Sequence, residues 1–336
     1  MGSELFNRLN YPENGVGANF LAIYLKLLIP NILQRLDRKL ALTPFLLFLA
    51  SCHSAPLDAV HREATTPVLS SPSHLQVELL AHLPAEINES SGLAKRHDIL
   101  WTHNDSGNPA TVFAMPASGG AITQRVNLKN AVNKDWEDLA QDDHTLYVAD
   151  CGNNMGDRQW LQIYKVAWQD LDRADNEGSL PSQLMKVRLA DIEPKPNLHA
   201  HNNDCEALTV VGEELWLFTK NWQDQNTRLY RIPKDSAVYE AKSDELFAAN
   251  GLITGADFDP QTQRLALIGY RLGFLNVSAF IWIVPVADNA PLWDKASYHT
   301  ISPAGQWEAI LWHQGNLLVT REQSPLSSPW LGIIYL

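Results

Sequence analysis

One short motif recurs five times along this chain, and a repeat of this kind limits the fold more than any other feature of the sequence. Its copies read ESSGLA at 89, DWEDLA at 135, DCEALT at 204, ITGADF at 253 and QWEAIL at 306. Successive copies begin 46, 69, 49 and 53 residues apart. Spacings close to these are typical of β-propeller blades, each of which is a four-stranded sheet. The sequence therefore predicts an all-β propeller.

Further apolar runs follow each copy, as expected for the remaining strands of a blade. The second runs end in polar residues and read ILWTHND, TLYVADC, ELWLFTKN, RLALIGYR and NLLVTRE. A third run follows in all five copies, but a fourth can be proposed only for the first four. We expect residues 75–83, LQVELLAHL, to supply the missing strand, which would close the ring and hide a sheet edge. Five blades are predicted, with six as the alternative.

The composition agrees with an all-β fold and restricts the possible partners. Eleven Trp, nine Tyr and ten Phe occur with 18 Gly and 19 Pro, which favours many short strands and turns over long helices. The chain has 26 Lys and Arg against 38 Asp and Glu, and its formal net charge is −12. An acidic protein of this kind is a poor partner for nucleic acid. We expect a monomer.

The stretch RLDRKLALTPFLLFLASC has the order of parts that an export signal requires. Arg35, Arg38 and Lys39 form a basic region, and the apolar run that follows, 40–50, is too short to span a bilayer. The run ends in LASC, which resembles the bacterial lipobox, so Cys52 is the predicted lipidation site. An ordinary signal peptide and a buried apolar segment are the alternatives.

This signal divides the chain into three parts. Residues 1–52 are predicted to be an N-terminal extension with a lipoprotein signal peptide. Residues 53–73 are rich in Ser, Pro, Thr and Ala, which favours a flexible tether, and 74–336 would form the propeller. By analogy with other lipoproteins, His53 after the cysteine favours export to the outer membrane of a Gram-negative bacterium. The membrane, reached through the lipid, is therefore an expected partner.

Acidic residues occupy the start of the recurring motif. In a propeller blade the start of the first strand and the end of the second lie on the same face, beside the central channel. Several carboxylates there would repel one another unless a cation lay between them. Oxygen ligands of this kind suit Ca²⁺. The predicted ligands are Glu89, Asp135, Glu137, Asp204 and Glu206. The alternative is that these acids pair between blades and hold no ion.

The ends of the second strands contribute the other candidate binding groups. A small anionic ligand would need positive or amide groups near the cation. The predicted substrate-binding residues are Asn104, Lys220, Arg271 and Arg321. If the site is catalytic, Glu206 or Asp135 would act as the general base.

Two cysteines remain for a bridge if Cys52 carries lipid. Cys151 ends a second strand and Cys205 lies at the start of the next copy, so adjacent blades would bring them together. We therefore predict a disulfide, which an exported protein can form.

Two weaker alternatives remain open for the chemistry of the site. One is a Zn²⁺ or Cu²⁺ site at His199 and His201, and the other is a nucleophile at Ser90 or Ser91. A third alternative is that a ligand stacks on the ring of Trp136, Trp222 or Trp307, although tryptophans in such strands usually pack in the core.

The series of motifs ESSGLA, LWTHNDSGN, DWEDLA, LYVADCGNN, CEALT and LWLFTKN resembles exported bacterial propellers, among them the phytase-like (esterase-like) and SdiA-regulated families. The resemblance covers most of residues 75–336. It implies a calcium-associated propeller with ion or site residues at Glu89, Asp135, Glu137 and Glu206. Two functions follow. The chain is expected to be a membrane-anchored lipoprotein whose acidic channel mouth binds an anionic ligand or an envelope component, or else a calcium-dependent phosphoester or ester hydrolase.

Overall fold

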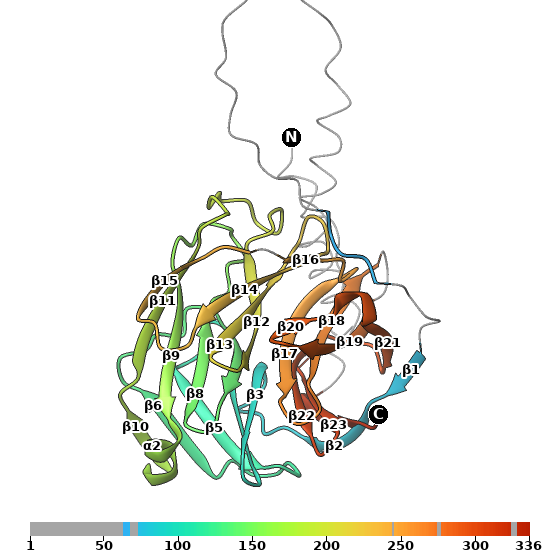
Figure 1. The fold of residues 1–336 in the computed structure, drawn as a ribbon. Helices are drawn as coiled ribbons and strands as arrows, with labels where there is room; N and C mark the ends of the chain where they lie inside the picture. The colour runs from blue at the N-terminus through green and yellow to red at the C-terminus, as the bar shows by residue number, and fades with distance from the viewer. Residues whose placement is uncertain (1–62, 68–72, 244, 274–276, 324–327) are drawn as a thin grey trace, which may run out of the picture. The chain divides into compact units, whose positions relative to one another are not determined.

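The computed structural model shows five sheets that follow one another around a ring, as the five-blade prediction requires (Figure 1). The residues that the structure describes are 63–67, 73–243, 245–273, 277–323 and 328–336. The predicted signal segment with Cys52 and most of the predicted tether lie outside these ranges. Within them, no helix is both long enough and apolar enough to cross a bilayer.

The first three blades each contain four strands in chain order from the channel outward. Blade 1 is built from β3 (Ser90–Arg96), β4 (Ile99–Asn104), β5 (Thr111–Pro116) and β6 (Gln124–Leu128). Blade 2 is built from β7 (Trp136–Gln141), β8 (Thr145–Asp150), β9 (Leu161–Ala167) and β11 (Gln183–Leu189). Blade 3 is built from β12 (Asp204–Val211), β13 (Glu214–Lys220), β14 (Thr227–Pro233) and β16 (Glu245–Phe247).

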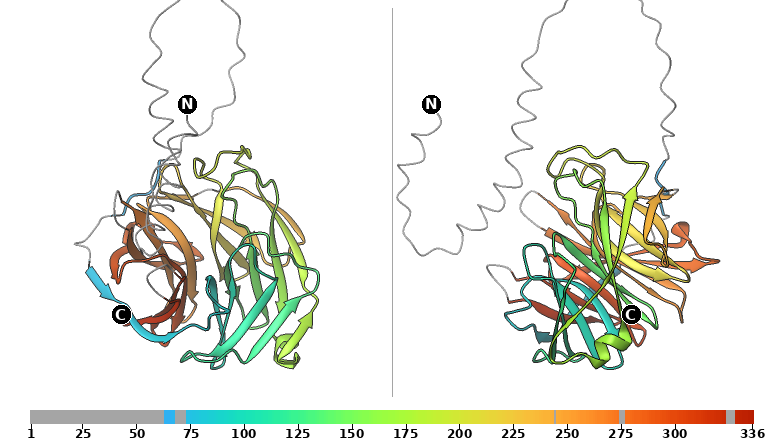
Figure 2. Two further views of the ribbon diagram at one scale, coloured as in Figure 1. Left: turned by 180° about the vertical axis from the view of Figure 1, so that it is seen from behind. Right: turned by 90° about the vertical axis from the view of Figure 1, so that its left-hand side faces the viewer.

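The last two blades complete the ring. Blade 4 is built from β17 (Leu252–Asp259), β18 (Arg264–Leu272), β19 (Val277–Ala287) and β21 (Ser297–Ser302), with the short β20 (Ala290–Pro291) paired to β19. Blade 5 is built from β22 (Trp307–His313), β23 (Asn316–Arg321), β24 (Trp330–Ile334) and β2 (Glu78–His82). The innermost strands contact one another in the order β3, β7, β12, β17 and β22, and β22 contacts β3 again. Figure 2 shows the resulting contact between the teal first blade and the red-brown last blade.

Ring closure follows the prediction, with one difference. Strand β2 pairs antiparallel with β24, with Glu78 opposite Ile333, and supplies the fourth strand that blade 5 lacks. The preceding residues do not continue this strand. They form β1 (Ser73–Gln76), which pairs in parallel with β21 of blade 4. Buried Val77 lies between the two strands, so one apolar run that looked like a single strand spans two blades.

Other segments of the chain pair with the outer edges of four blades, as strands in three of them and as a single bridge in blade 3. Strand β10 (Glu177–Leu180) lies parallel to β6, and β15 (Val238–Ala241) lies parallel to β11. Strand β1 covers β21, and Thr65 forms a parallel bridge to Phe247 of β16. Thr65 belongs to the segment expected to be a tether. These pairings satisfy backbone groups that an open sheet edge would leave free.

The long connection between β9 and β11 of blade 2 contains regular structure. Residues 169–184 include most of the short helix α2 (Trp168–Arg173) and all of β10. The helix is held by its buried side chains, since the Trp168 indole donates to the Asp142 carbonyl oxygen at 2.9 Å and Leu171 is fully buried. Another short helical turn, η2 (Trp293–Lys295), lies before β21.

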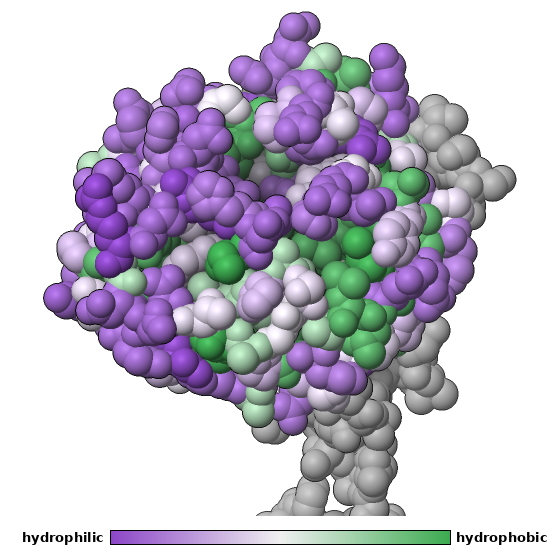
Figure 3. All heavy atoms as spheres, turned by 90° about the horizontal axis from the view of Figure 1, so that it is seen from below, coloured by the Kyte–Doolittle hydropathy of each residue, from purple (hydrophilic) through white to green (hydrophobic). Residues whose placement is uncertain are grey.

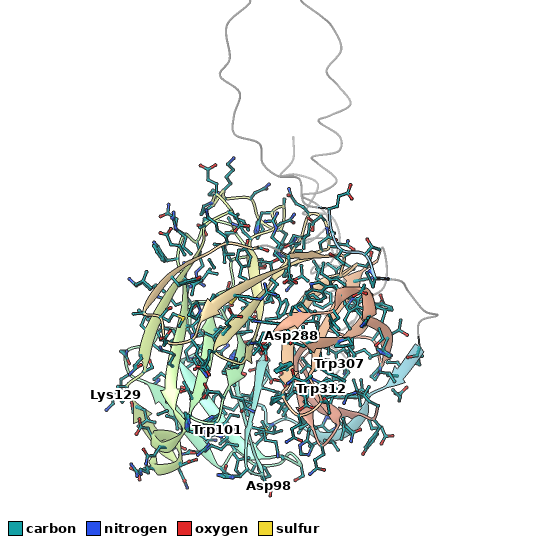
Figure 4. The ribbon with its side chains drawn as sticks, viewed as in Figure 1. Asp98, Trp101, Lys129, Asp288, Trp307 and Trp312 are labelled. Carbon is teal, nitrogen blue, oxygen red and sulfur yellow. A yellow bond between two sulfur atoms is a disulfide. The ribbon has the colours of Figure 1, made fainter. Side chains whose placement is uncertain are left out.

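The apolar core lies between the blades. Five clusters of buried residues each combine side chains from two adjacent sheets, and together they follow the ring. Trp136 and Trp307 are fully buried in these clusters, as expected for packing residues. Figure 4 labels Trp307 and, at the other end of β22, Trp312. On the face seen in Figure 3, hydrophilic residues cover most of the surface, and hydrophobic residues gather nearer the middle.

A disulfide joins Cys151, which directly follows β8, to Cys205 in β12. The Cα atoms lie 5.4 Å apart, within the range that a disulfide spans. The bridge therefore links the second strand of blade 2 to the first strand of blade 3, and the sequence prediction is confirmed. The two residues next to it, Gly152 and Glu206, belong to the channel mouth described below.

The closing strand gives a first prediction. A chain that begins at Val77 keeps β2, whereas a chain that begins at Pro84 lacks it. We expect the first to melt in one cooperative transition and the second to lose that transition, because β24 is then an open edge and the core between blades 5 and 1 is exposed. Thermal unfolding followed by circular dichroism tests this. Equal melting temperatures for the two chains would contradict the closure by β2.

The disulfide gives a second prediction. The cysteines are 54 residues apart, and closing a loop of this length stabilises a protein by about 4 kcal/mol in the chain-entropy description. Replacing both Cys151 and Cys205 with Ala should lower the free energy of unfolding in urea by about this amount. The double variant should not respond to a reductant that destabilises the wild-type protein. Two free thiols in mass spectra of the exported wild-type protein would contradict the bridge.

Candidate functional site

Every innermost strand contains a β-bulge at the same place, near its start. In each blade the pairing with the second strand skips one residue, so that one extra residue remains unpaired. The skipped residues are Ser91, Glu137, Glu206, Thr254 and Glu308. A bulge changes the direction of its side chain relative to a regular strand. These five residues are therefore structurally equivalent, and three of them are buried glutamates.

The bulges also correct the alignment of the fourth repeat. Thr254 occupies the position of Glu137, so the fourth copy reads LITGAD from residue 252 and not ITGADF from 253. The residue after the bulge, Gly255, lies too close to blade 5 to carry a side chain, because a Cβ atom there would be 2.6 Å from the carbonyl oxygen of Glu308. Thr254 donates its hydroxyl to the Trp307 carbonyl oxygen at 2.7 Å. Blade 4 thus supplies no acid at this position and is tied to blade 5.

Three carboxyl groups meet at the channel mouth between blades 1 and 2. Asp105 follows β4, Asp135 precedes β7, and Glu137 is the bulged residue of β7. One oxygen from each lies within 4.8 Å of the others. Gly152 permits this approach, since a Cβ atom there would lie 2.0 Å from Glu137 Oε1 and 2.4 Å from Asp135 Oδ2. This three-carboxylate cluster is the only group of His, Cys, Asp and Glu among the described residues with the spacing of metal ligands.

Glu137 is the most unusual member of the cluster. Its residue is 3% exposed, yet its carboxylate accepts no hydrogen bond from the part of the chain that the structure describes. Burial and the nearby carboxylates, with Glu206 first, raise the pKa of Glu137 well above its usual value. Burial also raises the pKa of Asp105 to about 6, and it raises the pKa of Asp135. The cluster must therefore hold protons or a cation.

A buried ion pair lies beside this cluster. The Lys220 ammonium at the end of β13 is 3.0 Å from Glu206 Oε1. The rings of Trp222 and Tyr270 lie 5.0 and 5.5 Å from the same ammonium, at distances that allow cation–π attraction. Burial opposes the charge of Lys220, but Glu206 and its neighbours hold the pKa of the lysine well above its usual value.

Blade 5 adds two further acids to the channel. Burial raises the pKa of Glu308, the bulged residue of β22, to about 7, although Lys220 opposes this shift. Burial and then the charges of Glu308 and Asp105 raise the pKa of Glu322, which follows β23. Glu308 lies near the start of β22 and Glu322 directly follows β23, and the sequence predicts that these strand ends lie at the channel. Neither residue was among the predicted ligands.

Two of the predicted calcium ligands, Asp204 and Glu89, accept hydrogen bonds from neighbouring residues. Asp204 accepts hydrogen bonds on both oxygens, from the Asn153 backbone N–H at 2.6 Å and from the Trp222 indole at 2.7 Å. Glu89 accepts a hydrogen bond from Asn108 Nδ2 at 2.7 Å. Of the five predicted ligands, the structure thus gathers Asp135 and Glu137 in the cluster with Asp105, and it pairs Glu206 with Lys220.

The predicted substrate-binding residues also lie in different parts of the structure. Lys220 lies among the channel carboxylates. The Arg271 guanidinium instead lies 5.2 Å from the ring centre of Tyr298, on the outer strand of blade 4. The Arg321 guanidinium lies 4.5 Å from the ring centre of Trp330, on the third strand of blade 5. Both arginines therefore pack on aromatic rings, and Arg321 also lies 5.5 Å from the ring centre of Trp307 at the start of the innermost strand β22.

Asn104 has a local structural role. Its side-chain oxygen accepts the Glu89 backbone N–H at 3.2 Å, and its Nδ2 donates to the Glu86 carbonyl oxygen at 2.7 Å. These two bonds hold the entry into β3 against the end of β4. Both polar ends of the Asn104 side chain are therefore used by the backbone of blade 1.

The alternative sites from the sequence find other partners. The Nε2 atoms of His199 and His201 each lie 3.0 Å from an oxygen of Asn154, and the His199 ring stacks on Trp222 at 4.1 Å. The two histidines do not form a metal-ligand group with any other residue that the structure describes. The Ser90 hydroxyl of blade 1 donates a hydrogen bond to Thr320 Oγ1 of the adjacent blade 5, at 3.0 Å.

The acid next to Glu137 has a different role. Asp138 is fully buried and accepts the backbone N–H groups of Leu139, Leu208 and Ala256 at 2.8, 2.9 and 3.3 Å. It therefore ties blade 2 to blades 3 and 4. Asp138 was not among the predicted ligands, and it pairs between blades, whereas Glu137 has no such partner among the described residues. DWEDLA thus contains one acid that holds the ring together, Asp138, and two that belong to the three-carboxylate cluster, Asp135 and Glu137.

The comparisons with known proteins identify no family for this chain. No known family profile matches the sequence, and no curated sequence is detectably similar. Similar solved structures include an exo-β-1,3-galactanase from Phanerochaete chrysosporium, at 10% identity and a TM-score of 0.49, covering 77% of this chain and 63% of that one. A putative oxidoreductase (glucose dehydrogenase) from Thermus thermophilus has 11% identity and a TM-score of 0.43, covering 78% and 100%. A gluconolactonase from Xanthomonas campestris has 14% identity and a TM-score of 0.38, covering 82% and 99%.

The raised pKa values predict how stability depends on pH. Glu308 and Asp257 each have a pKa of about 7 in the folded chain because they are buried, against about 4 when unfolded. The folded state then binds more protons between these values, so the free energy of unfolding should fall as the pH rises from about 5 to about 7.5. Urea unfolding in EDTA measures this. Glu308→Gln should reduce the slope, and stability that rises over this window would contradict the assignment.

Proposed function

We propose that this propeller binds a divalent cation, Ca²⁺ by the chemistry of its ligands, at Asp105, Asp135 and Glu137. The observation that carries the proposal is the Glu137 carboxylate, which is buried beside two other acids without a hydrogen-bond donor among the described residues. A buried carboxylate in that position needs a proton or a positive charge. Hard oxygen ligands from three side chains favour Ca²⁺, which accepts six to eight oxygens at flexible geometry.

The bound cation would in turn hold a small anionic ligand at the channel mouth. Three carboxylates leave coordination positions open, and an anion can fill them. The Lys220 ammonium, which donates to Glu206, is the second positive group of the channel. Without the cation the surrounding acids would repel an anion, so binding of the anion should require the metal.

We further propose that the chain is exported and anchored through lipid on Cys52. The LASC motif after a basic and apolar stretch supports this proposal. The Cys151–Cys205 disulfide also supports export, because such bridges persist mainly in oxidising compartments. The ligand would then be a small anion or an anionic envelope component outside the cytoplasm.

A calcium-dependent phosphoester or ester hydrolase is the second candidate. The observation that favours it is the pKa of Glu308, which burial raises to about 7, since a general acid or base works best near the ambient pH. The cation would polarise the scissile group, and Glu206 or Asp135 would act as the general base on the water, with Glu308 as a further candidate for that role. A phosphatase and esterase panel with calcium and with EDTA separates this function from binding alone. Turnover that calcium supports and Glu206→Gln abolishes would establish the hydrolase.

The cation site gives a direct test. Calcium at a hundredfold excess over its dissociation constant should stabilise the wild-type protein by about 2.7 kcal/mol. Glu137→Gln keeps the shape of the side chain but removes the charge, so this variant should stay folded and lose the calcium effect. Urea unfolding with calcium and with EDTA measures both proteins.

The matched control for this test is Glu193→Gln, because Glu193 is an exposed acid whose carboxylate faces Lys195 and solvent. This variant should keep the full stabilisation by calcium. If calcium and EDTA give the same unfolding curve for the wild-type protein, and metal analysis finds no ion, then the three carboxylates form a proton-sharing group without a metal.

A further inference from the structure

A buried arginine is linked to the three-carboxylate cluster through the backbone of blade 2. Arg158 comes from the loop between β8 and β9, and its side chain is 5% exposed. We propose that Arg158 is a positioning residue, which holds the backbone on both sides of Cys151 in the conformation that brings Asp135 and Glu137 together. The proposal rests on the proposed function, because the property that it sets is the affinity of the cluster for its cation.

The guanidinium of Arg158 forms three hydrogen bonds with the two residues next to Cys151. Its Nη1 donates to Asp150 Oδ1 at 3.1 Å and to the Gly152 carbonyl oxygen at 2.8 Å. Its Nη2 donates to the Asp150 carbonyl oxygen at 2.9 Å. The Asp150 side chain is fully buried, so water does not screen this ion pair. A planar guanidinium presents its N–H groups in a fixed fork, which suits it to hold several oxygens at once.

Two further hydrogen bonds connect this arrangement to the cluster. The Asp135 backbone N–H donates to Asp150 Oδ1 at 3.0 Å, and the Gly152 backbone N–H donates to the Asp135 carbonyl oxygen at 3.1 Å. Gly152 also lies so close to the carboxylates that a Cβ atom there would be 2.0 Å from Glu137 Oε1. In the described part of the chain, Arg158 itself forms no hydrogen bond or ion pair with a carboxylate of the cluster. It therefore acts on the cluster through Asp150 and Gly152.

Blade 1 shows that this strand entry can be held without an arginine. Asn104 has the place of Asp150 at the end of its second strand, and its side-chain oxygen accepts the Glu89 backbone N–H at 3.2 Å. An amide does this without a buried charge, whereas a buried carboxylate needs a positive partner. Blade 2 instead has an acid and an arginine, and the arginine also holds the carbonyl oxygen of Gly152. The additional bonds thus occur in the blade that supplies Asp135 to the cluster.

The charge of Arg158 and its positioning role predict opposite effects on calcium binding. The guanidinium is positive, so by charge alone its removal should strengthen the binding of a cation. By position its removal should weaken binding, because Asp150 and Gly152 lose their support and a metal site tolerates only small displacements of its ligands. Changing a residue that orients metal ligands typically lowers the affinity about 10- to 100-fold. The direction of the change therefore distinguishes the two roles.

The experiment measures the calcium dissociation constant of the full-length protein by isothermal titration calorimetry. Arg158→Lys keeps the charge but loses the fork, and Arg158→Met loses both, so each should bind calcium about 10- to 100-fold more weakly than wild type. The matched control is Arg188→Met, because Arg188 pairs with Glu240 on the exposed outer strands of blade 2, and this variant should bind as wild type does. Wild-type affinity in a folded Arg158→Lys protein, or tighter binding by Arg158→Met, would overturn the proposal.

A second variant keeps the test valid if the Arg158 variants do not fold. Asp150→Asn reproduces the arrangement of Asn104 in blade 1. It keeps an acceptor for the Asp135 backbone N–H and leaves both carbonyl oxygens that Arg158 holds, so its calcium affinity should stay close to that of wild type. Loss of calcium binding in this variant would show that the charge of Asp150 itself holds the ion, and Arg158 would then not be the positioning residue.

Amide hydrogen exchange in EDTA separates this proposal from the cation site. The backbone N–H groups of Asp135 and Gly152 should exchange faster in Arg158→Lys than in wild type, whereas those of β18 should not change. If wild type binds no calcium but these two amides exchange faster in the variant, the cation site is wrong and Arg158 still positions the carboxylates. Unchanged exchange at both amides contradicts the positioning role, whether or not wild type binds calcium.

Discussion

The burial of like charges around one axis is the constraint on which the rest of this structure depends. Each blade begins with a bulge, and the bulge places one side chain per blade beside the channel. Glutamates at three of the five places give an excess of negative charge where water is scarce. The ion pair of Lys220, the raised pKa values and the proposed cation all follow from the need to compensate that charge.

The ring can hold this unfavourable centre because its periphery is well connected. The strand β2 joins the last blade to the beginning of the domain, and parallel strands cover the outer edges of blades 1, 2 and 4. Asp138 bonds to the backbone of blades 3 and 4, and the disulfide fixes blade 2 to blade 3 next to the site. Such links hold the channel side chains in place against their mutual repulsion, which a preorganised binding site requires.

Much of the candidate site could be read from the sequence, but the division of labour within it could not. The motif DWEDLA marks Asp135 and Glu137 as channel residues, and the structure brings them together. Asp105 joins them only because the end of β4 lies against the start of β7. Asp204 has the same place in its motif as Asp135, yet a neighbouring backbone N–H and an indole occupy its oxygens. Motif position predicts where a strand begins, whereas hydrogen-bond partners depend on loops that differ between blades.

The sequence by itself determined the all-β class, the five repeats, the closing role of residues 75–83 and the pairing of Cys151 with Cys205, because these follow from periodicity and strand order. Only the tertiary structure decided that this run divides between blades 4 and 5, that Thr254 is the fourth equivalent of Glu137, and that Lys220 lies within the acids. The physical reason is that bulges and loop contacts shift single residues out of register, and a shift of one residue changes which side chain faces the channel.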